Sequence, residues 1–117
     1  MVDRRPADLD RVFRALADPT RREILVRIAR SDCTVAKLSR PFPISAPAIS
    51  RHLKVLEDAG LLERVRAGRH HHFHLNPQPL VEVRASLERL TTFWLRRLDE
   101  LEDFLDAEDS GAKRRAP

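Results

Sequence analysis

The hydrophobic positions in the first half of the chain recur at helical spacing. Residues 8–17 carry four of them at the steps of one helix face: Leu9, Val12, Phe13 and Leu16. A second helix is predicted from Asp18-Pro19 onward, because aspartate can cap a helix and proline suits its first turn. Its apolar face is Ile24, Leu25 and Ile28. Two amphipathic helices are therefore expected before residue 31.

Two more helices are predicted before the pattern changes. Thr34 can cap a short third helix that turns Val35 and Leu38 inward. A fourth helix is expected from its cap, Ser45, to Ala59, where Gly60 supplies a left-handed stop. Its buried stripe is predicted to be Ile49, Leu53 and Leu56.

After residue 60 the period becomes that of strands. The segments LLERVR (61–66), AGR (67–69) and HHHFHL (70–75) predict strand, turn and strand, with Phe73 and Leu75 facing the core. A long helix is then predicted over about 79–107. Its apolar positions are Leu80, Val83, Leu87, Leu90, Trp94, Leu98, Leu101 and Leu105.

The element order predicts a mainly α (α+β) winged helix-turn-helix, with five helices and one β-hairpin as the wing. We expect a domain over 8–107, a flexible N-terminus over 1–7 and a flexible tail over 108–117, because neither end shows apolar periodicity. The length of 117 residues fits one domain.

Composition narrows the function. Residues 1–75 carry 15 Lys/Arg against 9 Asp/Glu, whereas residues 76–117 carry 7 against 9, so the first half suits a polyanion. The single cysteine, Cys33, allows no disulfide within the chain and no multi-cysteine zinc site. With no membrane-length apolar run and no signal-peptide pattern, a cytoplasmic protein is expected. No catalytic motif or cofactor-binding motif is present, so we do not expect an enzyme.

The helix over 45–59 has the two faces that major-groove insertion needs. Opposite its apolar stripe lie Arg51 and Lys54, with Ser50 beside them and small residues near the start. Arginine can pair in a bidentate manner with guanine, and a helix N-terminus favours phosphate. Arg66 and Arg69 place cations on the hairpin, where a wing meets the DNA backbone. The residues predicted to bind double-stranded DNA are Ser45, Pro47, Ala48, Ser50, Arg51, His52, Lys54, Arg66, Arg69 and His70. For His52, the pattern favours a packed, hydrogen-bonded position at the edge of the core, and a phosphate contact is the alternative.

The segments ALADPTRREILVRIA (15–29) and ISAPAISRHLKVLEDAGLLERVRAGRHHHFHLNPQPL (44–80) resemble the ArsR/SmtB family of bacterial winged-helix regulators, over roughly residues 8–105. The resemblance implies a homodimeric transcription factor, usually a repressor and often autoregulatory. It also implies that the first and last helices form the dimer. The even apolar stripe of the last helix agrees, since so small a domain cannot cover it. The predicted interface residues are Leu9, Val12, Phe13, Leu16, Leu87, Leu90, Phe93, Trp94, Leu98, Leu101 and Leu105. A two-fold dimer would bind a palindromic operator.

Two metal sites that the resemblance implies lack their ligands here. Thr34-Val35-Ala36 stands where one site has a Cys-Val-Cys pair, and the 79–107 helix, where another site has histidine, contains none. The chain therefore resembles the SdpR-like branch, which has no identified metal ligand, and its effector is left open. Four of the five histidines fall within 70–74. His70, His72 and His74 share one strand face, so a metal- or pH-responsive sensor is the alternative function.

Overall fold

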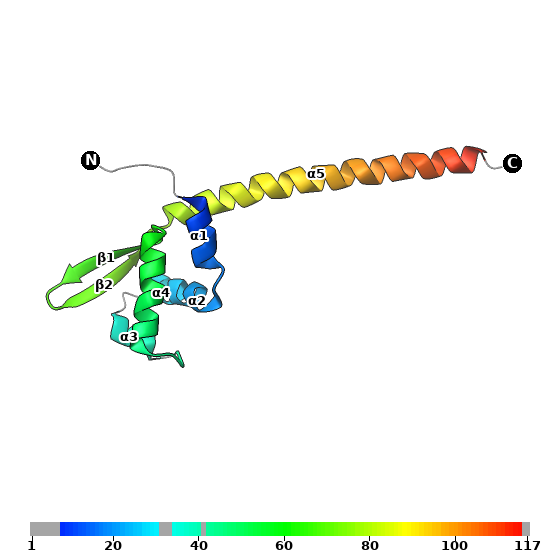
Figure 1. Ribbon diagram of the computed structural model, residues 1–117. Helices are drawn as coiled ribbons and strands as arrows, with labels where there is room; N and C mark the ends of the chain where they lie inside the picture. The colour runs from blue at the N-terminus through cyan, green and yellow to red at the C-terminus, as the bar shows by residue number, and fades with distance from the viewer. Residues whose placement is uncertain (1–7, 31–33, 41, 116–117) are drawn as a thin grey trace, which may run out of the picture. The chain divides into compact units, whose positions relative to one another are not determined.

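The computed structural model describes residues 8–30, 34–40 and 42–115. Within them, five helices and one antiparallel hairpin occur in the predicted order (Figure 1). Their bounds are α1 Leu9–Leu16, α2 Pro19–Arg30, α3 Val35–Ser39, α4 Ala46–Asp58, β1 Leu62–Ala67, β2 His70–Leu75 and α5 Gln78–Arg115. The expectations for residues 1–7 and for Cys33 lie outside the described residues. The chain divides into two compact units between Val83 and Arg84, where the sequence predicted one domain over 8–107.

The predicted caps hold the helix starts of the first unit. Asp18 Oδ1 accepts hydrogen bonds from the amides of Thr20 (2.8 Å) and Arg21 (3.2 Å) at the start of α2. Thr34 caps α3 and Ser45 caps α4, each accepting from the amide three residues later. These oxygens satisfy amides that have no partner inside the helix. After α4, Gly60 takes a φ of 79°, as the predicted stop requires.

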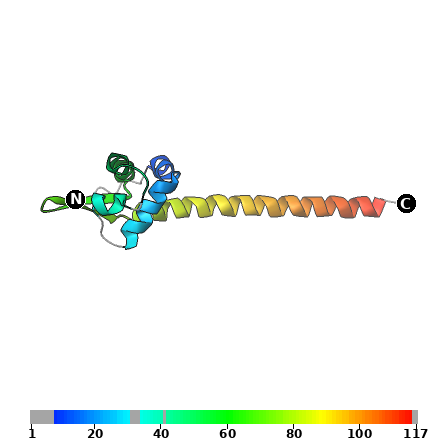
Figure 2. The same ribbon diagram turned by 90° about the horizontal axis from the view of Figure 1, so that it is seen from below.

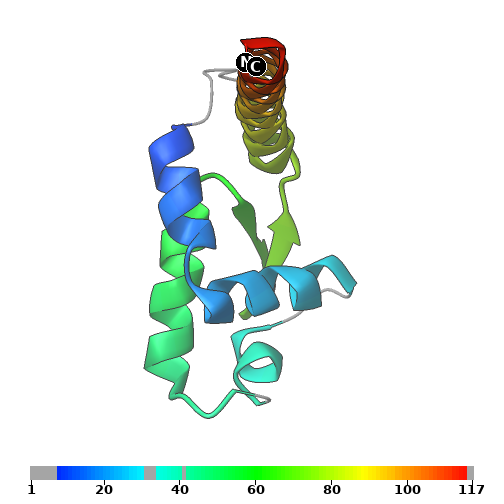
Figure 3. The same ribbon diagram turned by 90° about the vertical axis from the view of Figure 1, so that its right-hand side faces the viewer.

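The core of the first unit is one cluster drawn from every helix and from the hairpin. All three residues of the predicted α4 stripe are at most 1% exposed, and Phe73 of β2 is fully buried. Figure 3 shows α2 running crosswise to α4, and α2 contacts both α4 and the hairpin strand β2. The cluster comprises Val12, Ala15, Ile24, Leu25, Ile28, Leu38, Ile49, Leu53, Leu56, Ala59, Leu61, Leu62, Phe73 and Val83. Because its apolar stripe is buried in this core, α4 has the side opposite the stripe toward solvent.

The hairpin has the predicted strands and a two-residue turn. Its register pairs Leu62 with Leu75 and Ala67 with His70, and Gly68 occupies the left-handed region at φ 64° in the turn. Residues at paired positions share a face, so β1 and β2 alternate together. Leu62 and Phe73 therefore belong to the core face.

The second unit is the continuation of α5, which forms one unbroken helix through residues 84–115 (Figure 2). The sequence predicted a flexible tail over 108–117, and in the structure the helix continues to Arg115. Residues 108–115 are mostly good helix formers, and one internal glycine, Gly111, costs only about 1 kcal/mol relative to alanine. The proline that would end a helix comes only at 117.

Candidate nucleic-acid interface

The solvent side of α4 presents the predicted polar and small residues. Pro47, Ser50, Arg51 and Lys54 are exposed, and Ala48 is half-buried. Ser45 has a structural task as well, because its hydroxyl accepts a hydrogen bond from the Ala48 amide at 3.3 Å. This side of α4 is therefore open to a ligand along the first half of the helix.

The charged residues of α4 differ in how they are engaged. Arg51 makes no hydrogen bond or ion pair with any other residue that the structure describes. Lys54 Nζ lies 3.0 Å from Asp58 Oδ1, and this hydrogen bond, with the carboxylate's charge, raises the pKa of Lys54 above its usual value. The pair is exposed, so it is easily exchanged for other partners. Arg51 is thus the cation of α4 whose guanidinium has no hydrogen-bond or ion-pair partner among the described residues.

The base of the hairpin is joined to α4 through Arg64. Its guanidinium lies over the Phe73 ring at 5.2 Å and its Nη2 is 3.1 Å from Glu57 Oε1. Both acidic residues late in α4, Glu57 and Asp58, thus pair with cations of the chain itself. Arg64 was not among the predicted site residues. Because its guanidinium contacts Phe73 and Glu57, Arg64 links the hairpin to α4 and is not a cation without a partner.

The hairpin tip carries the predicted wing residues in exposed positions. Arg66 Nε donates to the Gly68 carbonyl at 3.3 Å, which steadies the turn. Arg69 and His70 are exposed, and Arg69 makes no hydrogen bond or ion pair within the described part of the chain. Two arginines therefore project from the tip, one braced against the turn and one open.

The histidines alternate between the two faces of β2. His71 shares the face of Phe73 but is exposed, while His70, His72 and His74 share the other face with Ala67, Val65 and Glu63. Among the residues that the structure describes, no three His, Cys, Asp or Glu side chains come together as a metal site.

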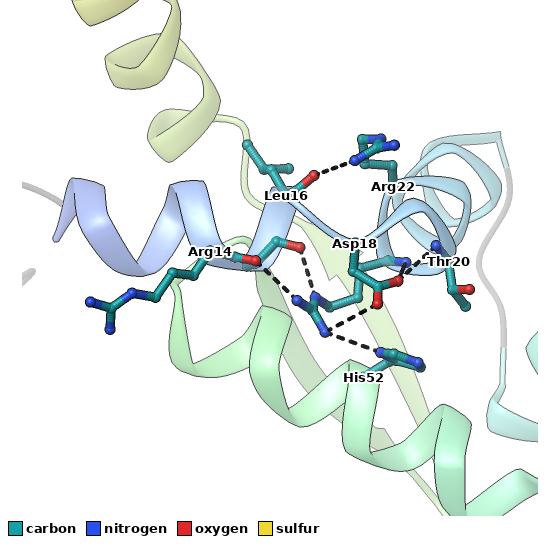
Figure 4. A network of polar contacts seen from close by, with 8 residues as sticks. Arg14, Leu16, Asp18, Thr20, Arg22 and His52 are labelled. Atoms are coloured by element: carbon teal, nitrogen blue, oxygen red, sulfur yellow. Dashed lines mark hydrogen bonds and ion pairs between the residues drawn. The ribbon is translucent and has the colours of Figure 1, made fainter.

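His52 lies beside the core, turned toward the junction of α1 and α2 (Figure 4). It is half-buried, and its Nδ1 is 3.3 Å from Nη1 of Arg21. This is a packed position at the edge of the core, one of the two predicted for His52. The same guanidinium approaches Asp18 Oδ2 at 3.9 Å.

The comparisons with known proteins agree with this geometry. Residues 18–64 match the family model described as bacterial regulatory protein, arsR family. The chain is also 41% identical over 99 residues to the HTH-type transcriptional regulator Rv2034 of Mycobacterium tuberculosis, which covers 85% of this chain and 90% of that protein. The chain belongs to the ArsR family.

Further relatives match this chain over different shares of its length. The transcriptional repressor SdpR of Bacillus subtilis is 38% identical over 68 residues, which is 58% of this chain and 76% of that repressor. Among solved structures, an ArsR-like transcriptional regulator from Rhodococcus sp. RHA1 superposes with a TM-score of 0.78 at 36% identity, covering 86% of this chain and 93% of that one. The predicted winged helix-turn-helix fold is confirmed. The chain is a DNA-binding regulator of this family, as its relatives are, and is not an enzyme. No helix in the described residues is long and apolar enough to cross a membrane.

The residues predicted for the dimer interface fall into two groups, one on α1 and one in the second unit. On α1, Val12 is fully buried in the chain's own core, so it offers no surface to a partner and its assignment to the interface is wrong. Phe13 is 38% exposed, and Leu9 and Leu16 are partly buried against the core. In the second unit, every side chain from 87 to 110 is exposed. The predicted members there are Leu87, Leu90, Phe93, Trp94, Leu98, Leu101 and Leu105, and Leu95 and Phe104 are exposed as well.

Sequence reasoning missed two arginines in the first turn of α2. Arg21 donates from Nε to the Ala15 carbonyl (2.7 Å) and from Nη2 to the Arg14 carbonyl (2.9 Å), and Arg22 donates from Nη1 to the Leu16 carbonyl (2.8 Å). These carbonyls are among the last of α1, and of them the Arg14 carbonyl also accepts a hydrogen bond from the Ala17 amide at 3.2 Å. The signal available was two arginines placed directly after a short link between helices, TRRE at 20–23. In this member of the ArsR family they cap the preceding helix.

Proposed function

We propose that the protein is a dimeric repressor that binds a palindromic operator, in the manner of its relatives that are named repressors. In this proposal α4 enters the major groove, the hairpin over 61–75 contacts the backbone as the wing, and the operator lies at the chain's own promoter. The carrying observation is that α4 keeps its apolar stripe in the core and holds Arg51 exposed on the other side without a partner among the described residues.

The position of Arg51 supports base contact. Arginine in the first half of a recognition helix can bond guanine through two donors, and nothing within the described chain competes for this guanidinium. Ser50 and Ala48 beside it are small enough to let the backbone approach a base edge. The amide end of α4 favours a phosphate next to these residues. Lys54 would exchange Asp58 for a phosphate at small cost, since the pair is exposed.

The hairpin supports a backbone contact at a second place. Arg69 and His70 are exposed at the tip, and Arg66 stands next to the turn. Phosphate contacts position a protein on the duplex without reading sequence. The hairpin therefore contributes affinity and orientation, whereas α4 contributes specificity.

A second copy of the chain is the partner that suits the second unit. Residues 87, 90, 94, 98, 101 and 105 form one narrow stripe along the helix at 3- and 4-residue steps, and each is about half exposed. Phe93 and Trp94 meet edge to face at 5.9 Å within the chain and add aromatic surface at its centre. Burial of such side chains contributes roughly 1.5–3 kcal/mol each. On α1, Phe13 offers further apolar surface.

The DNA-binding proposal is tested with fluorescence anisotropy on the chain's own promoter and on a scrambled duplex. We expect Arg51→Ala to weaken promoter binding by about 1–3 kcal/mol and to reduce discrimination against the scrambled duplex. Arg69→Ala should weaken binding to both duplexes equally and lower the salt dependence. Arg84→Ala is the matched control, since Arg84 is an exposed arginine paired with Glu88 on α5. Equal affinity of the wild type for promoter and scrambled DNA would refute specific regulation.

The dimer is tested by sedimentation equilibrium of the full chain. Leu98→Glu places a charge in the centre of the stripe, and we expect it to shift the protein from dimer to monomer. Thr92→Glu is the control, because it adds the same charge on the opposite side of the helix. A wild-type monomer at micromolar concentration, or a Leu98→Glu dimer as stable as the wild type, would contradict the proposal.

A further inference from the structure

The Arg21 guanidinium is the point at which three elements of the first unit meet. It contacts the end of α1, the Asp18 link before α2 and His52 on α4 (Figure 4). We propose that Arg21 and His52 are positioning residues for DNA binding: together they fix the rotation of α4 about its axis, and so the direction in which Arg51 points. The inference rests on the proposed function of α4 as the recognition helix.

The geometry immobilises the guanidinium before it reaches α4. Nε and Nη2 donate to the carbonyls of Ala15 and Arg14 at 2.7 and 2.9 Å, which leaves Nη1 aimed at His52. The cation also lies at the carbonyl end of α1, where the helix dipole favours positive charge. The Arg21 side chain is only 17% exposed, so few other orientations are open to it. A planar fork held by two carbonyls is a rigid reference for the third contact.

A directional contact of this kind can fix the rotation of α4 about its axis, which the apolar stripe cannot. Ile49, Leu53 and Leu56 hold α4 against the core, but hydrophobic burial has no direction. Side-chain tips lie about 5–6 Å from a helix axis, so a rotation of about 10° moves each tip by about 1 Å. A shift of that size is enough to spoil a bidentate hydrogen bond to a base. The bond from Arg21 to His52, adjacent to Arg51 in sequence, opposes such a rotation.

The contact requires that His52 Nδ1 accepts a hydrogen bond, since an arginine can only donate. Nδ1 is then unprotonated. The charged groups facing this ring are Arg21 of α2 and Asp18 of the link, and Arg14 of α1 directs its own guanidinium elsewhere (Figure 4).

The first test separates positioning of α4 from capping of α1. Arg21→Gln removes the contact with His52, whereas Arg22→Gln removes only a bond to the Leu16 carbonyl of the same helix end. With the folded fraction of each variant determined by urea unfolding, we expect Arg21→Gln to weaken promoter binding about tenfold and Arg22→Gln less than about twofold. Equal losses in the two variants would show that only the end of α1 matters, and would overturn the proposal.

The second test uses the acceptor itself. His52→Asn keeps an oxygen near the Nδ1 position, and His52→Leu keeps bulk without an acceptor. We expect the Asn variant to bind the promoter within about twofold of the wild type at pH 8, and the Leu variant about fivefold to tenfold more weakly.

The outcomes distinguish this inference from the proposed function. If the wild type fails to prefer promoter over scrambled DNA, the proposed function fails. If the wild type binds the promoter but the Leu variant binds equally well, or if the Asn variant binds as weakly as the Leu variant, the positioning role of His52 is refuted while the regulator remains.

Discussion

Asp18 is a single carboxylate on which both the start of α2 and the orientation of Arg21 depend. Its Oδ1 accepts two amide hydrogen bonds, and its Oδ2 lies 3.9 Å from the Arg21 guanidinium. Removal of a capping side chain by alanine costs about 1 kcal/mol, and loss of a negative charge at a helix start costs about 0.3–1 kcal/mol. We therefore expect Asp18→Ala to lower the free energy of unfolding by about 1–2 kcal/mol, and Asp18→Asn, which still caps, by about 0.5 kcal/mol.

The pH dependence of this effect has a definite sign. The hydrogen bond from the Arg21 amide, which outweighs the opposing effect of partial burial, lowers the pKa of Asp18, with smaller contributions from the Thr20 amide and from the charges of Arg21 and His52. Because the pKa is lower in the folded state than in the unfolded state, the carboxylate stabilises the protein above the ordinary aspartate pKa of about 3.9. That stabilisation is lost as the pH falls through the folded-state pKa.

The measurement is urea unfolding followed by circular dichroism, for the wild type and Asp18→Asn at one protein concentration. At pH 6 the wild type should be the more stable protein, and the difference should narrow as the pH is lowered toward about 3. All other carboxylates are shared, so their titration cancels in the comparison. A difference that stays constant or widens in acid would refute the assignment of Asp18 as an ionised cap.

Two further predictions concern the elements that carry the proposed interface. Ser45→Ala should lower the free energy of unfolding by about 1 kcal/mol, because Ser45 caps α4, whereas Ser50→Ala on the exposed side should change it little; equal urea midpoints for the wild type and Ser45→Ala would contradict this. Phe73→Ala should cost about 3–5 kcal/mol, since the ring is fully buried and carries the Arg64 guanidinium, while His71→Ala in the same strand should be nearly neutral. An unchanged melting temperature for Phe73→Ala would show that the hairpin is not part of the core.

The parts of the fold that were predicted correctly are those whose signals lie within a few residues. Ser45 caps an amide three residues later, and Ile49 and Leu53 lie one turn apart, so sequence spacing alone contains both features. Val12 shows the limit of this reasoning. It shares the apolar stripe of α1 with Phe13, and only the three-dimensional packing decides that Val12 faces the core and Phe13 remains partly exposed.

The polar contacts that were missed join residues distant in the chain. Arg21 and His52 are 31 residues apart, and no local pattern indicates that one reaches the other. Arg64 also reads as a surface residue of a strand, yet it contacts Glu57 of α4 and the Phe73 ring. Such contacts depend on how helices cross, and periodicity predicts which face of a helix is apolar but not the helix that will cover it. The exposed positions of Arg51 and Arg69 were therefore predictable, whereas the contacts that support α4 and the hairpin were not.

The bridge formed by Arg64 has a consequence for the thermodynamics of binding. Its contacts to Phe73 and Glu57 tie the base of the hairpin to the second half of α4. Two contact surfaces that are already held in register lose less conformational freedom when a ligand engages both of them. The hairpin base and α4 are then already ordered in the folded protein before a ligand binds. The conformational adjustment that binding still requires is expected at the hairpin tip, around Gly68 and Arg69. A duplex whose groove spacing departs from this fixed register would have to deform itself, so DNA flexibility becomes part of the selectivity.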